Sequence, residues 1–345
     1  MYVYVLIWAI PALFALSPVR VSPALRALLL IAVAGALTMI IGLRFEVGAD
    51  WFNYVSIHDG IVAAPTPLWI ALSEPAYALL NRLAPDPVGG IVIVNLVCAT
   101  IYVTGLVLLC RDQPLPALAL AVAIPYLSIV VAMGYTRQSA ALGFVFLGLV
   151  ALRRGWVWTY LALIVAATLF HTSAIVAAPL MLVRTSPRVR ILAVPLFIAV
   201  LPIVFILSST MFSDKFDIYV VRGMSSEGAL TRVLMNVVPA IIFLGWRARF
   251  QARWPDDVAI GTALAIAAIL SVPLLAVAST AADRINLFIA PLQIVVYARL
   301  PLLLRGHWRA AAYTGVLTLY GATLALWLTT SFYAACCWIP YRWAL

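Results

Sequence analysis

Long apolar runs recur from one end of this 345-residue chain to the other, and they constrain its fold more than any other feature. The runs are continuous, whereas the strands of a transmembrane barrel would alternate apolar and polar residues. Some are close to the roughly 20 residues that carry a helix across a bilayer, and others are shorter. Twelve runs are present, at about 2–16, 25–43, 89–110, 117–134, 138–152, 156–170, 173–183, 191–209, 233–246, 257–278, 285–299 and 311–330. The pattern predicts an all-α polytopic membrane protein.

Composition narrows the class of protein further. Hydrophobic residues make up 66% of the chain and charged residues only 10%, against about 25% charged residues in a soluble domain. This balance excludes a soluble enzyme, a disordered chain and a disulfide-rich secreted domain. The net charge of +10 does not indicate nucleic acid as a partner, because the arginines are dispersed between apolar runs and form no basic stripe. Attraction to anionic membrane lipids explains the positive net charge better than binding to nucleic acid does.

We expect a single integral membrane domain over residues 1–345, with about twelve transmembrane or re-entrant helices. The short runs 156–170 and 173–183 predict a bent or re-entrant hairpin, and the longest polar connections are 44–88 and 210–232. Alternating the runs across a membrane places 14 of the 22 basic residues, but only three of the 12 acidic residues, on one side. By the positive-inside rule that side is cytoplasmic, so both termini lie outside.

The polar residues with the most distinctive chemistry then fall on the outer side, many of them at the ends of apolar runs. Ionisable groups in such places are costly unless they face a polar cavity. They therefore predict one outward-opening site at the outer leaflet of the membrane. These residues are Arg44, Glu46, Asp50, Glu74, Arg137, His171, Lys215, Asp217, Arg222, Asp283 and Arg284.

The segment after the second run places one cation and two carboxylates at the interface. Asp50 has the chemistry to accept a proton or to orient a hydroxyl, and Trp51 has the ring to stack on a sugar. Trp51 and Tyr54 also fit an ordinary interfacial aromatic belt. Further on, Ser73, Glu74 and Pro75 predict the start of a helix that continues to about Leu83, and helix capping alone explains all three.

Two isolated polar residues mark later ends of apolar runs. Arg137 has no acidic neighbour in the sequence, and its planar guanidinium suits a phosphate; the alternative is snorkelling to the interface. His171 lies at the tip of the predicted hairpin, where it is a candidate base, a phosphate donor or a satisfied interface residue. No His, Cys and Asp set has the spacing of a metal site, and nucleotide-binding motifs are missing.

The last candidates lie near the C-terminus. Asp283 and Arg284 form either a local ion pair or, through Arg284, part of an anion clamp with Arg137. Trp338 and Tyr341 close the chain outside, where aromatic rings anchor the end or line a saccharide groove.

Taken in order, these segments resemble the EpsG family, although no single motif is specific to it. The resemblance covers almost the whole chain. Thr172 and Ala76 stand where the family often has other residues, and the charged groups are unchanged. The matching segments are Arg44…Val47-Gly48-Ala49-Asp50…Tyr54, Ser73-Glu74-Pro75-Ala76-Tyr77, Tyr135-Thr136-Arg137-Gln138-Ser139-Ala140-Ala141, Phe170-His171-Thr172-Ser173-Ala174, Asp283-Arg284 and Pro340-Tyr341.

The resemblance implies a Wzy-like polymerase that joins saccharide repeat units carried on undecaprenyl pyrophosphate at the outer leaflet. It implies a metal-independent glycosyltransferase without a cofactor, a GT-C-like helix bundle, and a chain-length regulator and a flippase as partners. A lipid-linked glycan transporter or an O-antigen ligase-type transferase are the alternatives. We assign pyrophosphate binding to Arg44, Arg137 and Arg284. The catalytic candidates are Asp50 or His171 as the base, with Glu74 as a second carboxylate. The predicted sugar contacts are Trp51, Tyr54, Tyr77 and Trp338.

Overall fold

The computed structural model describes residues 1–18, 21–65, 67–86, 89–189, 191 and 228–344. These residues are helical wherever they have regular structure and contain no β-strand, only an isolated bridge between Arg44 and Trp343. The prediction of an all-helical protein is confirmed for this part of the chain. The chain divides into two compact units, one formed by residues 1–150, 162–174 and 297–345, and the other by residues 151–161 and 175–296.

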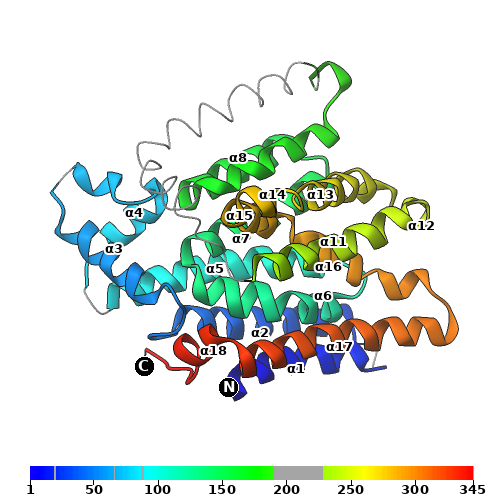
Figure 1. The fold of residues 1–345 in the computed structure, drawn as a ribbon, viewed down its shortest axis with the longest axis horizontal. Coiled ribbons are helices and arrows are strands. Elements are labelled where there is room, and N and C mark those ends of the chain that lie inside the picture. Colours follow the sequence, from blue (N-terminus) through cyan, green and yellow to red (C-terminus); the bar gives the residue numbers. More distant parts are fainter. Residues whose placement is uncertain (19–20, 66, 87–88, 190, 192–227, 345) are drawn as a thin grey trace. The chain divides into compact units, whose positions relative to one another are not determined.

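In the first unit, α2 lies against α5, and α1 lies against α6 and α17 (Figure 1). The short helices α3 and α4 pack on each other and on α5. The elements are α1 (Tyr2–Leu16), α2 (Pro23–Gly42), α3 (Trp51–Ala63), the 3₁₀ turn η1 (Leu68–Ala71), α4 (Pro75–Leu83), α5 (Gly89–Arg111), α6 (Pro116–Ala123), η2 (Ile124–Ala132), most of α7 (Thr136–Arg153), the 3₁₀ turn η7 (Leu300–Leu303), α17 (Gly306–Thr330) and α18 (Phe332–Cys337).

The second unit has α11 packed against α13 and α15. Two elements, α8 (Val157–Phe170) and the 3₁₀ helix η3 (Thr172–Arg184), contribute residues to both units. The elements of the second unit are α11 (Ala229–Gly245), α12 (Arg247–Arg253), η6 (Pro255–Asp257), α13 (Val258–Leu270), α14 (Leu274–Val277), α15 (Ser279–Ile289) and α16 (Pro291–Tyr297).

Eleven of the twelve predicted runs coincide with helices, and the run 191–209 lies almost entirely outside the described residues, as does most of the connection 210–232. Within the described part, four helices are long and apolar enough to cross a membrane: Pro23–Gly42, Gly89–Arg111, Pro255–Ala276 and Gly306–Thr330. Two bent pairs raise the number to six if each pair is one span, namely α11 with α12, bent by 74°, and Ser279–Ile289 with Pro291–Leu303, bent by 45°. These helices indicate a multi-pass membrane protein, whereas the count of twelve stays a prediction.

The packing of α5 against α7 brings the predicted site residues of α7 beside the rest of the first unit. Gly105 and Gly143 meet at this crossing, and a Cβ on Gly105 would lie 2.1 Å from the Gly143 carbonyl oxygen. Small residues of this kind let membrane helices approach closely. Before α7, the π-helix η2 contains Pro125, and such segments are frequent near functional sites.

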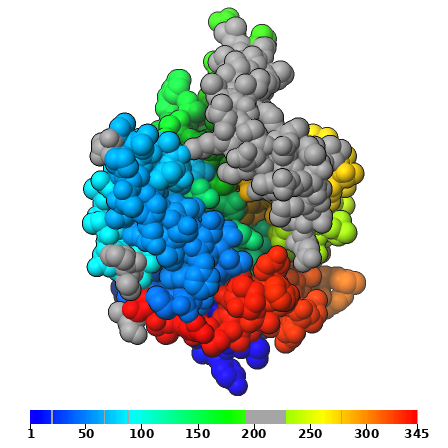
Figure 2. Space-filling view, turned by 60° about the vertical axis from the view of Figure 1, so that its left-hand side comes forward, coloured from blue at the N-terminus to red at the C-terminus, as the bar shows by residue number. Residues whose placement is uncertain are grey.

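The C-terminal segment returns to cover the loop between α2 and α3. The backbone N–H of Phe45 donates to Arg342 at 3.0 Å, and that of Gly48 donates to Cys337 at 2.8 Å. In Figure 2 this segment, in red, lies beside the blue surface of α3 and its neighbours. The loop after α2 and the C-terminal segment therefore meet at one end of the first unit's helices.

Candidate functional site

Glu74 is the centre of the candidate site, because its carboxylate contacts both Arg137 and His171. Oε2 accepts a hydrogen bond from Arg137 at 2.6 Å, and Oε1 lies 3.2 Å from Nδ1 of His171. The three side chains retain exposures of 16%, 21% and 10%. The structure thus brings together three of the residues that the sequence singles out. Glu74 is 63 residues from Arg137 and 97 residues from His171 in the sequence.

Each of the three side chains is placed by the end of a helix. Glu74 is the residue before α4, with Pro75 at the first helical position, and no side-chain cap bond is present there. The predicted helix to Leu83 is confirmed, although Glu74 rather than Ser73 occupies the N-cap position. Arg137 lies in the first turn of α7, and His171 directly follows α8.

Two buried tyrosines flank the guanidinium of Arg137. Its Cζ lies 5.7 Å from the ring centre of Tyr54 and 5.8 Å from that of Tyr77. The two rings contact each other edge to face, with centres 5.9 Å apart. Both belong to a buried cluster that includes Trp51 and Cys98. Tyr54 and Tyr77 therefore hold Arg137 in place, and in this structure their rings are not open to a sugar.

The hydrogen-bond partners of His171 determine which of its nitrogens carries a proton. Nε2 lies 3.2 Å from the amide nitrogen of Gln138, which is a donor. Nε2 is then the acceptor, and the proton on Nδ1 points to Glu74. A histidine oriented by a carboxylate in this way has its basic nitrogen on the opposite side, and here the amide of Gln138 occupies that nitrogen.

The charges of the site stabilise one another despite their burial. Burial by itself raises the pKa of Glu74, but the hydrogen bond from His171 and the charge of Arg137 hold that pKa well below its ordinary value. Burial likewise lowers the pKa of Arg137, and the charge of Glu74 raises it above its ordinary value. The carboxylate and the guanidinium are consequently both ionised at neutral pH.

Three buried polar atoms at the site have no hydrogen-bond partner within the described structure. They are Nε of Arg137, the hydroxyl of Tyr77, and the hydroxyl of Ser173, two residues after His171. A buried donor without a partner costs about 1–3 kcal/mol. These atoms are therefore the places where a polar ligand would gain hydrogen bonds that the protein itself does not supply.

The sequence predicts that Arg44 binds pyrophosphate, and the structure gives this arginine a different position. Its side chain is 1% exposed. Its guanidinium donates to the carbonyls of Ile41 and Val47 at 2.5 and 3.2 Å, and to Asn95 and Thr136 at 3.3 and 2.7 Å. Because all three guanidinium nitrogens are engaged, Arg44 joins the end of α2 to α5 and α7 in this structure and is not presented to a ligand.

Asp50 and Trp51 lie at the start of α3. Asp50 is half-buried and stands one helical turn before Tyr54. Burial raises the pKa of Tyr54 to about 12, the charge of Arg137 opposes that rise, and the charge of Asp50 adds to it. Trp51 is 4% exposed and packs edge to face on Phe45, with ring centres 5.6 Å apart. Asp50 is thus near the site, whereas the ring of Trp51 is enclosed.

Trp338 is also enclosed, which removes the surface through which it would contact a sugar. It is 1% exposed, its indole N–H donates to the carbonyl of Ile129 at 2.9 Å, and its ring packs on Trp327. A buried indole with a satisfied N–H is a packing residue.

Arg284 belongs to α15 in the second unit, so its predicted clamp with Arg137 stays a prediction. Its neighbour Asp283 forms an ion pair with Arg232 of α11.

Sequence reasoning did not assign roles to Gln138, Ser173, Asn95 or Thr136. The first two contact or flank His171, and the last two hold Arg44. In the sequence, the one sign of a role for these four residues was their position near the charged candidates, since uncharged polar residues are common at helix ends. Among the described residues, no group of three or more His, Cys, Asp and Glu is arranged to hold a metal ion.

Comparison with known proteins gives one match. No curated protein and no solved structure matches the chain. A model of the EpsG family matches residues 27–343, which include Glu74, Arg137 and His171 and nearly the whole of the chain. The chain belongs to the EpsG family.

Proposed function

We propose that this protein is a bacterial polysaccharide polymerase that joins saccharide repeat units carried on undecaprenyl pyrophosphate. Membership of the EpsG family and the apolar helices support a membrane polymerase of this type. The observation that carries the proposal is the cluster of Glu74, Arg137 and His171. It combines an oriented base with a cation that has an unpartnered donor, and both are needed to transfer a sugar from a pyrophosphate.

The proposed reaction is a direct displacement at the anomeric carbon. The hydroxyl of the acceptor sugar attacks C1 of the donor, the C1–O bond to pyrophosphate breaks, and undecaprenyl pyrophosphate leaves with the bonding electrons. The attacking hydroxyl replaces the amide of Gln138 as the hydrogen-bond donor to Nε2 of His171, and Nε2 then takes its proton. Glu74 holds the ring and stabilises the imidazolium that forms. A single displacement inverts the configuration at C1.

Arg137 is the proposed pyrophosphate ligand. Its charge stabilises the negative charge that develops on the leaving oxygen, and its unpartnered Nε supplies a donor. Arg284 remains the proposed second cation of the clamp. Tyr54 and Tyr77 act in this scheme as positioning residues for Arg137.

Asp50 is the alternative base. Its position one turn before Tyr54 keeps it in the proposal. Glu74 is a weaker candidate for a nucleophile because its carboxylate is already engaged by Arg137 and His171. The proposed location is the inner membrane with the site facing outward, and a flippase and a chain-length regulator are the proposed partners.

The test is a size analysis of lipid-linked glycans in cells that lack the native gene and express single variants. We expect Arg137→Ala, His171→Ala and Glu74→Gln to accumulate single repeat units on the lipid and to make no polymer. Arg82→Lys is the matched control, because Arg82 donates to the carbonyls of Ile61 and Val62 away from the cluster. It should make polymer of normal length.

Asp50→Asn and His171→Ala together identify the base. Loss of polymer in His171→Ala with substantial polymer in Asp50→Asn supports His171, and the reverse supports Asp50. If single units fail to reach the outer leaflet in the Arg137→Ala cells, the protein moves lipid-linked sugar, and the polymerase proposal is wrong.

A further inference from the structure

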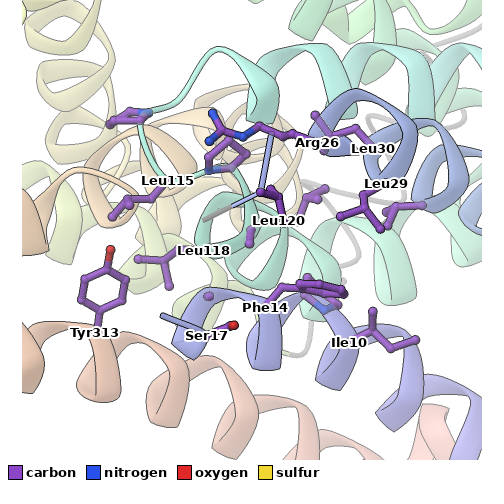
Figure 3. A pocket seen from close by; sticks show the side chains of 17 residues that line it. Ile10, Phe14, Ser17, Arg26, Leu29, Leu30, Leu115, Leu118, Leu120 and Tyr313 are labelled. Carbon is purple, nitrogen blue, oxygen red and sulfur yellow. The ribbon is translucent and has the colours of Figure 1, made fainter. Parts of the chain in front are cut away.

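A cavity of about 410 Å³ lies within the first unit, away from the Glu74 cluster. Figure 3 shows its lining, which comes from the end of α1, the first turns of α2, the start of α6 and Tyr313 of α17. The side chains are mostly apolar and include Phe14, Leu30 and Leu118. The volume is in the range of small-molecule sites, roughly 300–1,000 Å³.

The length of α2 separates this cavity from the candidate site. Arg26, which lines the cavity, is in the first turn of α2, and Arg44 lies two residues beyond the end of that helix. At 1.5 Å per residue the two positions are about 27 Å apart along the helix. The hydrocarbon core of a bilayer is about 30 Å thick. The cavity and the site are therefore at opposite membrane surfaces if α2 spans the bilayer.

Basic residues surround the cavity end of the unit. The guanidinium of Arg26 extends over the cavity in Figure 3. Arg309 precedes Tyr313 by four residues, which places the two on the same face of α17, and Arg305 is the residue directly before that helix. Arg111 ends α5 just before the turn that lines the cavity, and Asp112 is the acidic residue of that turn.

This arrangement fits a ligand with a long apolar tail and an anionic head. Both α2 and α6 begin at the cavity, and the positive ends of their dipoles add to the charge of the arginines. The excess of arginine marks this end as cytoplasmic, where anionic lipids concentrate and basic pockets between helices bind their head groups. The lipid substrate of the proposed polymerase would instead present its phosphates to Arg137 at the other surface.

We propose that this cavity binds an acyl chain of an anionic phospholipid from the cytoplasmic leaflet, with the lipid phosphate held by Arg26. The bound lipid fills the gap between α1, α2, α6 and α17 and ties their cytoplasmic ends together. The proposal does not depend on the polymerase activity.

The test is native mass spectrometry of the purified full-length protein, with phosphatidylglycerol and phosphatidylcholine of identical acyl chains added in turn. We expect the wild-type protein to retain phosphatidylglycerol preferentially. Arg26→Gln should reduce that preference about fivefold, the loss expected for one arginine near a lipid phosphate. Ala117→Phe, which fills the cavity, should reduce retention of both lipids.

Arg188→Gln is the matched control, because Arg188 is an exposed arginine of the second unit that is predicted to lie on the same membrane side. It should leave the preference unchanged. Equal effects of Arg26→Gln and Arg188→Gln would overturn the proposal, and so would displacement of phosphatidylglycerol by a polyprenyl phosphate at equal concentration. Because Arg26 is exposed, Arg26→Gln should fold like the wild type. It therefore tests the proposal even if Ala117→Phe does not fold.

Discussion

At the scale of single residues, the candidate site depends on one carboxylate that serves two partners. Glu74 forms an ion pair with Arg137 and orients the ring of His171. Burial makes these contacts strong, because each group would be costly to leave without its partner. A single substitution at Glu74 consequently changes both the anion site and the base.

Replacement of Glu74 by Gln tests this dependence through stability. We expect the variant to lose about 1–3 kcal/mol at pH 7, the usual cost of leaving a buried partner unsatisfied. The folded-state pKa of Glu74 lies below the ordinary value of about 4.3, so its contribution is complete above that pH and is lost as the pH falls toward the folded-state pKa. The difference in Tm between the two proteins should be constant from about pH 8 to 5 and narrow below about pH 4.

Thermal unfolding of the purified protein in detergent measures this difference. Glu46→Gln is the control, since Glu46 pairs with Arg342 at a more exposed position, where ion pairs contribute little. A Glu74→Gln variant as stable as the wild type at pH 7 would show that Glu74 does not hold the site together.

At the scale of elements, a polar seam joins the helices of the second unit. The amide of Asn236 on α11 donates to the carbonyl and side-chain oxygens of Asn286 on α15, at 2.8 and 2.9 Å. Gln293 of α16 donates to the side chain of Asn236 at 2.7 Å. One turn earlier on α11, Arg232 pairs with Asp283. Hydrogen bonds of this kind hold apolar helices in one register.

Replacement of Asn236 by Leu should weaken the packing of α11 on α15. We expect a loss of roughly 0.6–2 kcal/mol, the range for a hydrogen bond between membrane helices. Unfolding by increasing SDS in mixed micelles measures the change. Val238→Leu, at an exposed position of the same helix, is the control and should unfold like the wild type. Identical unfolding of all three proteins would mean that the seam does not contribute to stability.

At the scale of the whole molecule, the predicted orientation places the Glu74 cluster outside and the basic cavity inside. The second unit is joined to the first by α8 and η3, and both units contain candidate spans. Orientation governs function here, because a lipid-linked donor is reached only from the leaflet that contains its head group.

Labelling of single cysteines in spheroplasts tests the orientation. Cys98, Cys110, Cys336 and Cys337 are first replaced by alanine. A membrane-impermeant thiol reagent should label Asp59→Cys, an exposed position of α3, in intact spheroplasts. It should label Arg309→Cys only after the membrane is permeabilised. The opposite pattern would reverse the topology and place the candidate site in the cytoplasm.

The sequence by itself determined the helical class and most of the helix positions. Continuous apolar runs admit only helices when the backbone must satisfy its own hydrogen bonds in lipid, and the runs at 2–16 and 89–110 coincide closely with α1 and α5. It also singled out Glu74, Arg137 and His171, because charged residues are rare and conspicuous in a chain with this composition.

Only the tertiary structure decided which of these residues meet. The contacts of Glu74 span 63 and 97 residues of sequence, and no local pattern records such distances. Tertiary packing also enclosed Arg44 and Trp338, which look identical in sequence to exposed binding residues. Arginine and tryptophan serve equally well in a buried network and at a ligand surface, so their surroundings in the fold determine their role.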